Sequence, residues 1–299
     1  MPDKLLELKN DLVFQKIFGT QKNKLITSHF LSLILEKEIF NLDLDANKRL
    51  LKNRKDSKTC RLDIRAKFNN GEDCNIELQV APYPYMAERM LEYWAGMYDQ
   101  KISSGQGYEV LKPSFSILIT NFELKKLKNI SRYHTIWNLR EKEYHNMILS
   151  DNIELHILEI PKIKDDEVLK DELAQWLKFI ENPENKEVEK FMQENKFWKQ
   201  AKEELAYLSG DPDFHRIVEA RAGMLKDIHS FEYIGQTVGR EEGRKEGRKE
   251  GLKEGLKEGR VEGKNEAKTE IAKKMKAKDM PIEEIIELTE LTKEEIEKL

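Results

Sequence analysis

The pattern of apolar and polar residues is clearest in two short segments, which alternate with a period of two and therefore predict β-strands. The first covers residues 61–68 and the second covers residues 75–80. The sequence Asn69-Asn70-Gly71 lies between them and is a turn signal, so we expect a hairpin. The apolar residues of both strands are even-numbered and must share one face, because a slip of one residue would expose one set. A three-residue loop with a left-handed glycine meets this condition by pairing Phe68 with Glu72.

This register places two acidic residues, Asp63 and Glu77, opposite each other on the polar face of the hairpin. Gln79, Arg65 and Lys67 are expected on the same face. Two carboxylates at cross-strand distance can form a site for a divalent cation, because hard cations prefer oxygen ligands. The alternative is that these residues are simply solvated, as polar residues on one face of an antiparallel sheet usually are.

Basic residues are concentrated around this hairpin. Residues 48–67 contain nine Lys or Arg and two Asp, an excess of seven positive charges, although the whole chain has a formal net charge of −4. The net charge does not indicate a nucleic-acid-binding protein, but the local excess could attract a polyanion. The alternative is a solvated basic strand and loop. The nine residues are Lys48, Arg49, Lys52, Arg54, Lys55, Lys58, Arg61, Arg65 and Lys67.

The rest of the N-terminal half predicts helices and strands around one main sheet. A helix capped by Asn10 or Asp11 is expected to continue to about Phe40, with a break near Gly19. The order of helix, strands, helix and strands indicates an α/β or α+β fold. The other expected elements are a short strand near 49–51, a helix over 86–103 and strands over 114–120, 133–139 and 153–160.

Residues 165–233 have a helical and strongly charged pattern, and they form either a helical cap on the core or a small separate bundle. Beyond them, a glycine recurs at every fourth position from Gly239 to Gly263, in blocks that end in Glu. Each glycine costs a helix about 1 kcal/mol relative to Ala, which Glu–Lys pairs offset only in part. We therefore predict a marginal, solvated helix that a partner orders.

The last segment predicts two short helices, the first capped by Asp279 and the second by a capping box of Thr292 and Glu295.

Composition limits the possible location of the chain. No apolar run reaches the length of a membrane span, and the N-terminus lacks a charged-then-apolar signal pattern. The 299 residues include two cysteines, which indicates a reduced, cytoplasmic protein.

A wider ordered set of residues resembles a known family. Asp63 followed by Glu77-x-Gln79, on a hairpin between two helices, looks like the motif of PD-(D/E)XK nucleases. Together with several further motifs, it resembles the Rpn family of recombination-promoting nucleases, which are PD-(D/E)XK nuclease family transposases. The resemblance covers residues 5 to about 160 and the Gly-x-x-Glu tail. The further motifs are Asp11-x-x-Phe14-x-x-x-Phe18, Leu62-Asp63, Ile76-Glu77-Leu78-Gln79, Arg89-x-x-x-Tyr93, Gln100, Gly105, Tyr108 and Pro113-x-Phe-x-Ile-x-Ile.

The resemblance implies an α/β, restriction-endonuclease-like PD-(D/E)XK core with a mixed sheet flanked by helices, a helical insert and a long helical C-terminal tail. It also implies Mg²⁺-dependent hydrolysis of phosphodiester bonds in DNA, during recombination or transposition. Asp63, Glu77 and the Leu78 carbonyl would hold Mg²⁺, and Gln79 and Asp11 would complete the catalytic set. The residues expected to contact DNA are Lys55, Lys58, Arg61, Arg65, Lys67 and Arg89.

Two departures from the family motif matter. Gln79 stands where the motif usually has lysine, and Gln can orient water but cannot supply positive charge; Arg65 or Lys67 would have to do so. Leu62 stands where the motif has proline, and this replacement costs little because proline is not a metal ligand. Two residues also have simpler interpretations, because Asp11 can be only a helix cap and Arg89 can belong to a polar seam between helix and sheet.

We therefore expect a nuclease core over 1–164, a helical extension over 165–234, the repeat tail over 235–270 and a terminal helical pair over 271–299. The expected function is that of a Mg²⁺-dependent DNA endonuclease, without membrane contact, which forms homo-oligomers through its tail. The alternative is a nuclease fold with weak or no catalysis that serves as a nucleic-acid-binding or assembly module.

Overall fold

The structure is a computed structural model that describes residues 4–46, 49–50, 60–61, 63–82 and 84–299. By its internal contacts the chain divides into two compact units, Met1–Ala222 and Gly223–Leu299. Among the described residues, no helix is both long enough and apolar enough to cross a membrane.

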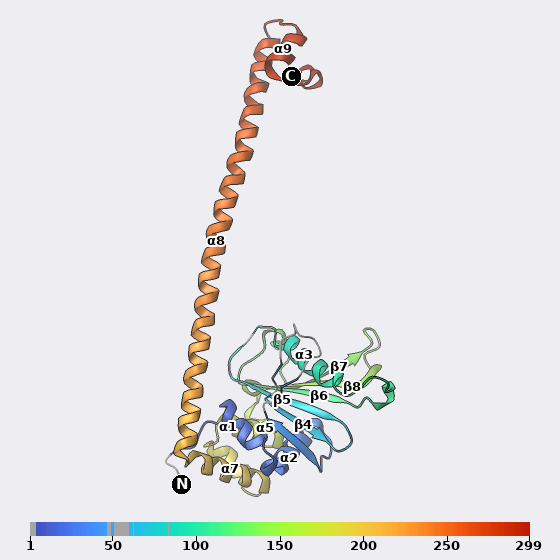
Figure 1. Cartoon of the computed structure of the whole chain (residues 1–299), viewed down its shortest axis with the longest axis vertical. Coiled ribbons are helices and arrows are strands. Elements are labelled where there is room, and N and C mark those ends of the chain that lie inside the picture. The colour runs from blue at the N-terminus through green and yellow to red at the C-terminus, as the bar shows by residue number, and fades with distance from the viewer. Residues whose placement is uncertain (1–3, 47–48, 51–59, 62, 83) are drawn as a thin grey trace. The chain divides into compact units, whose positions relative to one another are not determined.

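A six-stranded mixed sheet forms the centre of the first unit, in the order β1-β4-β5-β6-β8-β7 (Figure 1). The strands β5, β6 and β8 are parallel to one another, and the remaining pairs are antiparallel. This is the mixed sheet flanked by helices that the resemblance implied. The strands are β1 (Leu42–Ala46), β4 (Ile64–Phe68), β5 (Asp73–Gln79), β6 (Ser114–Thr120), β7 (His134–Arg140) and β8 (Ile148–Glu159), with a separate pair β2 (Arg49–Leu50) and β3 (Cys60–Arg61).

The hairpin of β4 and β5 has the predicted register. Ile64 pairs with Ile76, and the Phe68 N–H donates to the Glu72 carbonyl at 2.9 Å. Gly71 has a φ of 87°, a left-handed conformation that favours glycine. The parity of the apolar positions was therefore sufficient to fix which residues face each other.

Most of the polar face of this hairpin is buried, so the simpler interpretation as solvated residues is wrong for Glu77 and Arg65, although Lys67 is exposed. The strand β5 lies inside the sheet, and Asp73, Asn75 and Glu77 are all buried. The helix α3 (Met86–Asp99) follows β5 and covers this face, where its Met86 and Met90 pack with residues of β6 and β8. Polar residues at these positions are thus held in a protein interior, where each one needs a partner or a function.

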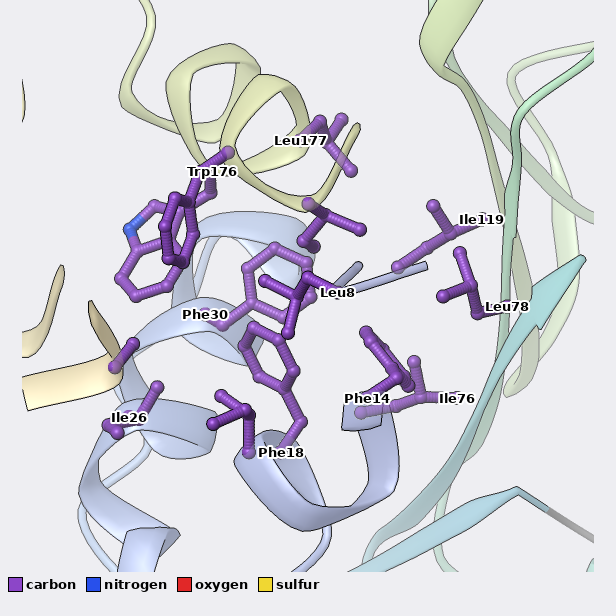
Figure 2. Close-up of a cluster of buried hydrophobic side chains, with 14 of the residues drawn as sticks. Leu8, Phe14, Phe18, Ile26, Phe30, Ile76, Leu78, Ile119, Trp176 and Leu177 are labelled. Carbon is purple, nitrogen blue, oxygen red and sulfur yellow. The ribbon is translucent and has the colours of Figure 1, made fainter. Parts of the chain in front are cut away.

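The opposite, apolar face of the sheet carries the main core (Figure 2). Phe14 and Phe18 from α1 (Asp11–Phe18) and Phe30 from α2 (Lys24–Leu35) pack there against the β5 side chains Ile76 and Leu78. This layer holds the strand that carries Glu77 rigidly from behind.

The helices after residue 164 complete the same core. Trp176, from α5 (Glu172–Glu181), is fully buried, with its ring centroid 6.1 Å from that of Phe18 and 5.9 Å from that of Phe30. The segment therefore packs as a cap on the core, one of the two arrangements that the sequence left open. The other helices here are α4 (Asp165–Val168), α6 (Lys186–Met192) and α7 (Lys196–Ser209), and the 3-10 turns of the unit are η1 (Gln21–Asn23), η2 (Tyr108–Val110), η3 (Lys125–Leu127) and η4 (Ile160–Lys162).

Two predicted helix ends were wrong. The helix expected to reach Phe40 ends at Leu35, because Glu36 adopts a left-handed conformation with a φ of 50°. The chain then enters β1, a strand that we did not predict. The helix expected over 86–103 ends at Asp99.

The glycine repeat lies in one helix, α8 (Pro212–Lys276), and its described side chains from Val238 to Lys264 are exposed. The end of α8 packs with α9 (Ile282–Thr289) and α10 (Lys293–Glu297) around Ala272, Ile285 and Ile296. The predicted capping box of Thr292 and Glu295 is present. Asp279 is not a cap, because it is left-handed with a φ of 58° and Pro281 occupies the N-cap position.

Candidate active site

The two predicted carboxylates lie together where β4 begins and β5 approaches its end. Glu77 is near the end of β5 and its residue is 2% exposed. Asp63 is partly buried just before β4, and continuing the β4–β5 register by one residue places it opposite Glu77. The Asp63 Oδ2 accepts the Leu78 N–H at 3.4 Å. The hairpin thus brings the two carboxylates, one from just before β4 and one from β5, next to each other.

Among the described residues, the ladder between β4 and β5 ends at the pair Ile64–Ile76, and the main chain of Leu78 lies just beyond it. In a strand, the N–H and the carbonyl of one residue point to the same side. Since the Leu78 N–H points to Asp63, the Leu78 carbonyl also points to that side. Its side chain meanwhile faces the apolar core.

The helix α3 places an arginine over Glu77. The Arg89 Nη2 donates to the Glu77 Oε2 at 3.0 Å, and the Arg89 Nε donates to the Tyr93 hydroxyl at 2.7 Å. These two residues are one helical turn apart, so they face the sheet together. Arg89 therefore belongs to a seam between helix and sheet, and that seam includes the candidate site itself.

A second ion pair lies close to Asp63. Asp11 is the first residue of α1, whose cap is Asn10, and its Oδ2 accepts from the Arg221 Nη2 at 3.0 Å and from Nε at 3.1 Å. Both residues lie close enough to Asp63 to act on its charge. Sequence reasoning missed Arg221, because it is 210 residues from Asp11 and its surroundings show only an ordinary helical pattern.

Burial raises the pKa of both site carboxyls well above their ordinary range. For Glu77, the nearby charge of Asp63 is the second cause, and Arg89 opposes the rise. For Asp63, burial is again the largest cause, while the Leu78 N–H and Arg89 oppose it. Two carboxylates that share a desolvated site repel each other, and a cation between them would remove this cost.

The residues present fit a divalent cation. The Glu77 Oε1 is buried and has no hydrogen-bond partner in the described part of the chain. Asp11, Asp63 and Glu77 oppose Arg89 and Arg221, so the formal charge of the cluster is negative. Among the described residues, no three His, Cys, Asp or Glu side chains are grouped so that they could hold a metal ion. The donor set is therefore two carboxylates and a main-chain oxygen, which leaves positions for water, as Mg²⁺ sites usually do.

Gln79 is the last residue of β5, half-buried, and its side chain favours the charged form of Glu77. It therefore lies beside the carboxylates, as predicted.

The predicted basic residues are not all available to a ligand. Arg65 is 3% exposed and donates to Asp73 at 2.6 Å and to the Gln100 amide at 2.8 Å, so its prediction as a DNA contact was wrong. Lys67 is exposed, but in the strand register it lies opposite Asp73. Asp73 precedes Glu77 by four residues, so Lys67 is about 13 Å along the strand from the site. Lys55 and Lys58 lie outside the described residues, and so does the side chain of Arg61.

The mixed sheet and its acidic edge define a nuclease-like α/β protein of the PD-(D/E)XK class. The chain belongs to the PD-(D/E)XK nuclease family transposases, because the model of that family matches residues 8–231. The match includes the capping helices after residue 164, which our motif comparison covered only in general character. No curated protein and no solved structure gives a significant match to the chain. Nucleases of this class typically use divalent metals.

Proposed function

We propose that the chain is a Mg²⁺-dependent DNA endonuclease that acts in recombination or transposition. The observation that carries the proposal is the buried Glu77 Oε1, which has no hydrogen-bond partner among the described residues and lies beside Asp63 and the Leu78 main chain. An unpaired buried carboxylate oxygen costs free energy unless a ligand satisfies it. A divalent cation at this place would satisfy it and offset the repulsion between Asp63 and Glu77.

Each residue of the site has a role in this proposal. Asp63, Glu77 and the Leu78 carbonyl would hold Mg²⁺, which would lower the pKa of a bound water and neutralise charge on the phosphate. Gln79 orients the attacking water through its amide. Arg89 supplies the positive charge that Gln79 cannot, since its guanidinium already lies 3.0 Å from Glu77. Asp11 and Arg221 position Asp63 from the other side.

The proposal is tested by plasmid nicking with Mg²⁺ and with EDTA, for the wild-type chain and for Asp63→Ala. Cleavage is expected only for the wild type with Mg²⁺. DNA binding without cleavage under every metal condition would instead favour the alternative, a nuclease fold that binds DNA or assembles without catalysis. The replacement of the motif lysine by Gln79 is the observation that keeps this alternative open.

Neutralising Lys55, Lys58 and Arg61 together is expected to weaken DNA binding and to flatten its dependence on salt. The reason is that each phosphate contact releases counterions from DNA, so the slope of log affinity against log salt should fall by about 0.9 per lost contact. Fluorescence anisotropy over a series of salt concentrations measures this slope. The matched control neutralises Lys125, Lys126 and Lys128, and an unchanged slope in the test variant would place DNA elsewhere.

We also propose that the tail joins copies of the chain. A chain that ends at Tyr233 is expected to fold, because no side chain that the structure describes after Val218 belongs to the main core. Its mass in solution, measured by light scattering at equal concentration, should be lower than that of the full chain. Cleavage chemistry should remain, because Asp63, Glu77 and Gln79 all precede the truncation. An unchanged oligomeric state would remove the tail from assembly.

A further inference from the structure

The β7–β8 hairpin forms an arm with an unusual amount of exposed apolar surface. We define the arm as residues 136–149, the end of β7, the turn and the first residues of β8. Seven large apolar or aromatic residues in it are at least 40% exposed. An apolar surface of this density on a soluble protein marks an interaction site. The seven are Ile136, Trp137, Leu139, Tyr144, Met147, Ile148 and Leu149.

The arm is held in one conformation rather than left loose. At its turn, the Glu141 N–H donates to the Met147 carbonyl at 3.0 Å, and the Arg140 Nη1 donates to the His145 carbonyl at 2.7 Å. At its root, the Asn152 side chain donates to the Tyr98 hydroxyl of α3 at 2.9 Å. A surface ordered in advance loses little conformational entropy when it binds.

Two strands, β6 and β8, separate the β7 part of the arm from the strand that carries Glu77, and the tip of the arm lies far from the candidate active site. Glu77 is level with Leu118 of β6, which is level with Ile157 of β8. Ile148, near the tip, precedes Ile157 by nine residues, which is about 30 Å along an extended strand. Ile136, at the root, pairs with His156 and is separated from Glu77 by three strand spacings, about 14 Å across the sheet. The arm can be followed in Figure 1 as the hairpin between β7 and β8, which leaves the sheet at the end where β6 begins. The arm is therefore not part of the site proposed for DNA cleavage.

The charge of the arm does not suit a polyanion. Arg140 and Lys142 are balanced by Glu141 and Glu143, so the formal charge of residues 136–149 is zero. Affinity for a nucleic-acid backbone requires an excess of positive charge. The arm is instead suited to a protein surface that is itself apolar and neutral.

The outer edge of β7 offers main-chain groups as well. The strand is last in the sheet order, and no other strand of the described chain pairs with its outer edge. It has no proline and one charged residue, Arg140 at its end, so two of the usual features that block strand addition are nearly absent, and the irregularity in its pairing with β8 lies between Trp137 and Arg140. An edge of this kind accepts another strand.

We propose that this edge and arm join two copies of the chain, with β7 of one copy antiparallel to β7 of the other. A two-fold register centred on Asn138 places Trp137 opposite the partner's Leu139, and Leu139 opposite the partner's Trp137. Odd-numbered side chains share one face of a strand, so both apolar pairs form on the same face. On this face the register pairs apolar side chains with apolar side chains, and no two like charges of the strand lie opposite each other.

The available area agrees with a dimer. The seven exposed side chains each leave on the order of 100 Å² open, if a large side chain presents about 150–250 Å². Together they offer on the order of 700 Å² per copy, close to the roughly 800 Å² per partner of a standard interface. This inference does not depend on nuclease activity, and its test measures mass and not cleavage.

The first test compares the full chain with Trp137→Thr/Leu139→Thr, in which both new residues still favour a strand. Both are also made as chains that end at Tyr233, so that the tail cannot hold copies together. There the arm variant should have half the mass of its parent in sedimentation equilibrium, with an unchanged circular dichroism spectrum. The matched control, Leu169→Thr/Ile217→Thr, removes exposed apolar residues elsewhere in the same unit and should keep the wild-type mass. An unchanged mass in the arm variant, or a monomeric wild type, would overturn the proposal.

The second test examines the register by cysteine cross-linking of the full chain, in a Cys60→Ser background that leaves only the buried Cys74. Asn138→Cys should form a disulfide-linked dimer with oxidised glutathione, because the register puts this position opposite itself. Ile136→Cys should not form this dimer, because position 136 lies opposite position 140 of the partner. The two introduced cysteines would then be about 13 Å apart along the strands, whereas a disulfide spans about 6 Å between Cα atoms. Equal cross-linking at both positions, or none at 138, would overturn the register. Loss of DNA binding without a change of mass would assign the arm to DNA instead.

Discussion

Asp63→Asn and Glu77→Gln are each expected to reduce Mg²⁺-dependent cleavage on the order of 10³-fold. Each change removes an anionic oxygen ligand while it keeps the size of the side chain. A bound metal supplies several kcal/mol of stabilisation to the transition state, and each 1.36 kcal/mol corresponds to a factor of ten. Single-turnover nicking of a supercoiled plasmid measures the rate of the chemical step.

The control for this experiment is Asp43→Asn, an exposed carboxylate on the neighbouring strand β1. It removes the same charge without touching the site, and its cleavage rate should match that of the wild type. Mg²⁺ should raise the melting temperature of the wild type and of the control, but not that of Asp63→Asn or Glu77→Gln, because only a protein that binds a ligand in its native state is stabilised by it. Wild-type cleavage by either site variant would contradict the assignment of Asp63 and Glu77.

When no metal is present, Asp63→Asn should increase the stability of the folded protein, although it reduces cleavage in the presence of Mg²⁺. In the metal-free protein, burial raises the pKa of Asp63, so the folded state holds a proton more tightly than the unfolded state does. Stability is then highest at low pH and falls as the pH rises from the ordinary carboxyl range, about 4, through the raised pKa. Asp63→Asn removes this penalty and should increase the free energy of unfolding on the order of 2 kcal/mol at pH 8.5.

At pH 4 this gain in stability should disappear, because the folded wild type and the folded variant then both carry a neutral side chain at position 63. Urea denaturation in EDTA at the two pH values measures the difference, and Asp43→Asn again serves as the control. The Asn side chain keeps an oxygen for the Leu78 N–H, so the comparison isolates the charge. A variant that is less stable than the wild type at pH 8.5 would show that Arg89 and the Leu78 N–H outweigh the burial of the Asp63 charge.

The hairpin could be predicted from sequence because its information is local. Alternation with a period of two fixed the faces of β4 and β5, and Gly71 fixed the turn. The strand β1 was missed because its pattern has only two large apolar residues, Leu42 and Leu44, after a segment that looks helical. Boundaries of this kind depend on neighbours in space, in this case on the pairing of β1 with β4.

The environment of the site was harder to predict, because it depends on what covers the sheet. Arg65 has the same sequence signal as a basic residue that contacts DNA, and only the position of α3 above it shows that it is buried against Asp73. Arg221 reaches the site from the far end of the unit. Neither burial nor long-range approach can be obtained from alternation or spacing, because the first depends on how α3 covers the sheet and the second on the contact of Arg221 with Asp11 of α1.

The packing of the capping helices has a consequence for synthesis on the ribosome. Residues from the two ends of the first unit meet, as in the hydrogen bond of 2.8 Å from the Leu6 N–H to the Ser209 hydroxyl. A nascent chain that has emerged only to residue 164 lacks Trp176 and leaves Phe18 and Phe30 without their cover. Because domains fold as units during translation, the proposed cutting site would assemble only after more than 200 residues have left the exit tunnel. An interrupted translation product would then be a target for proteases and not an active nuclease.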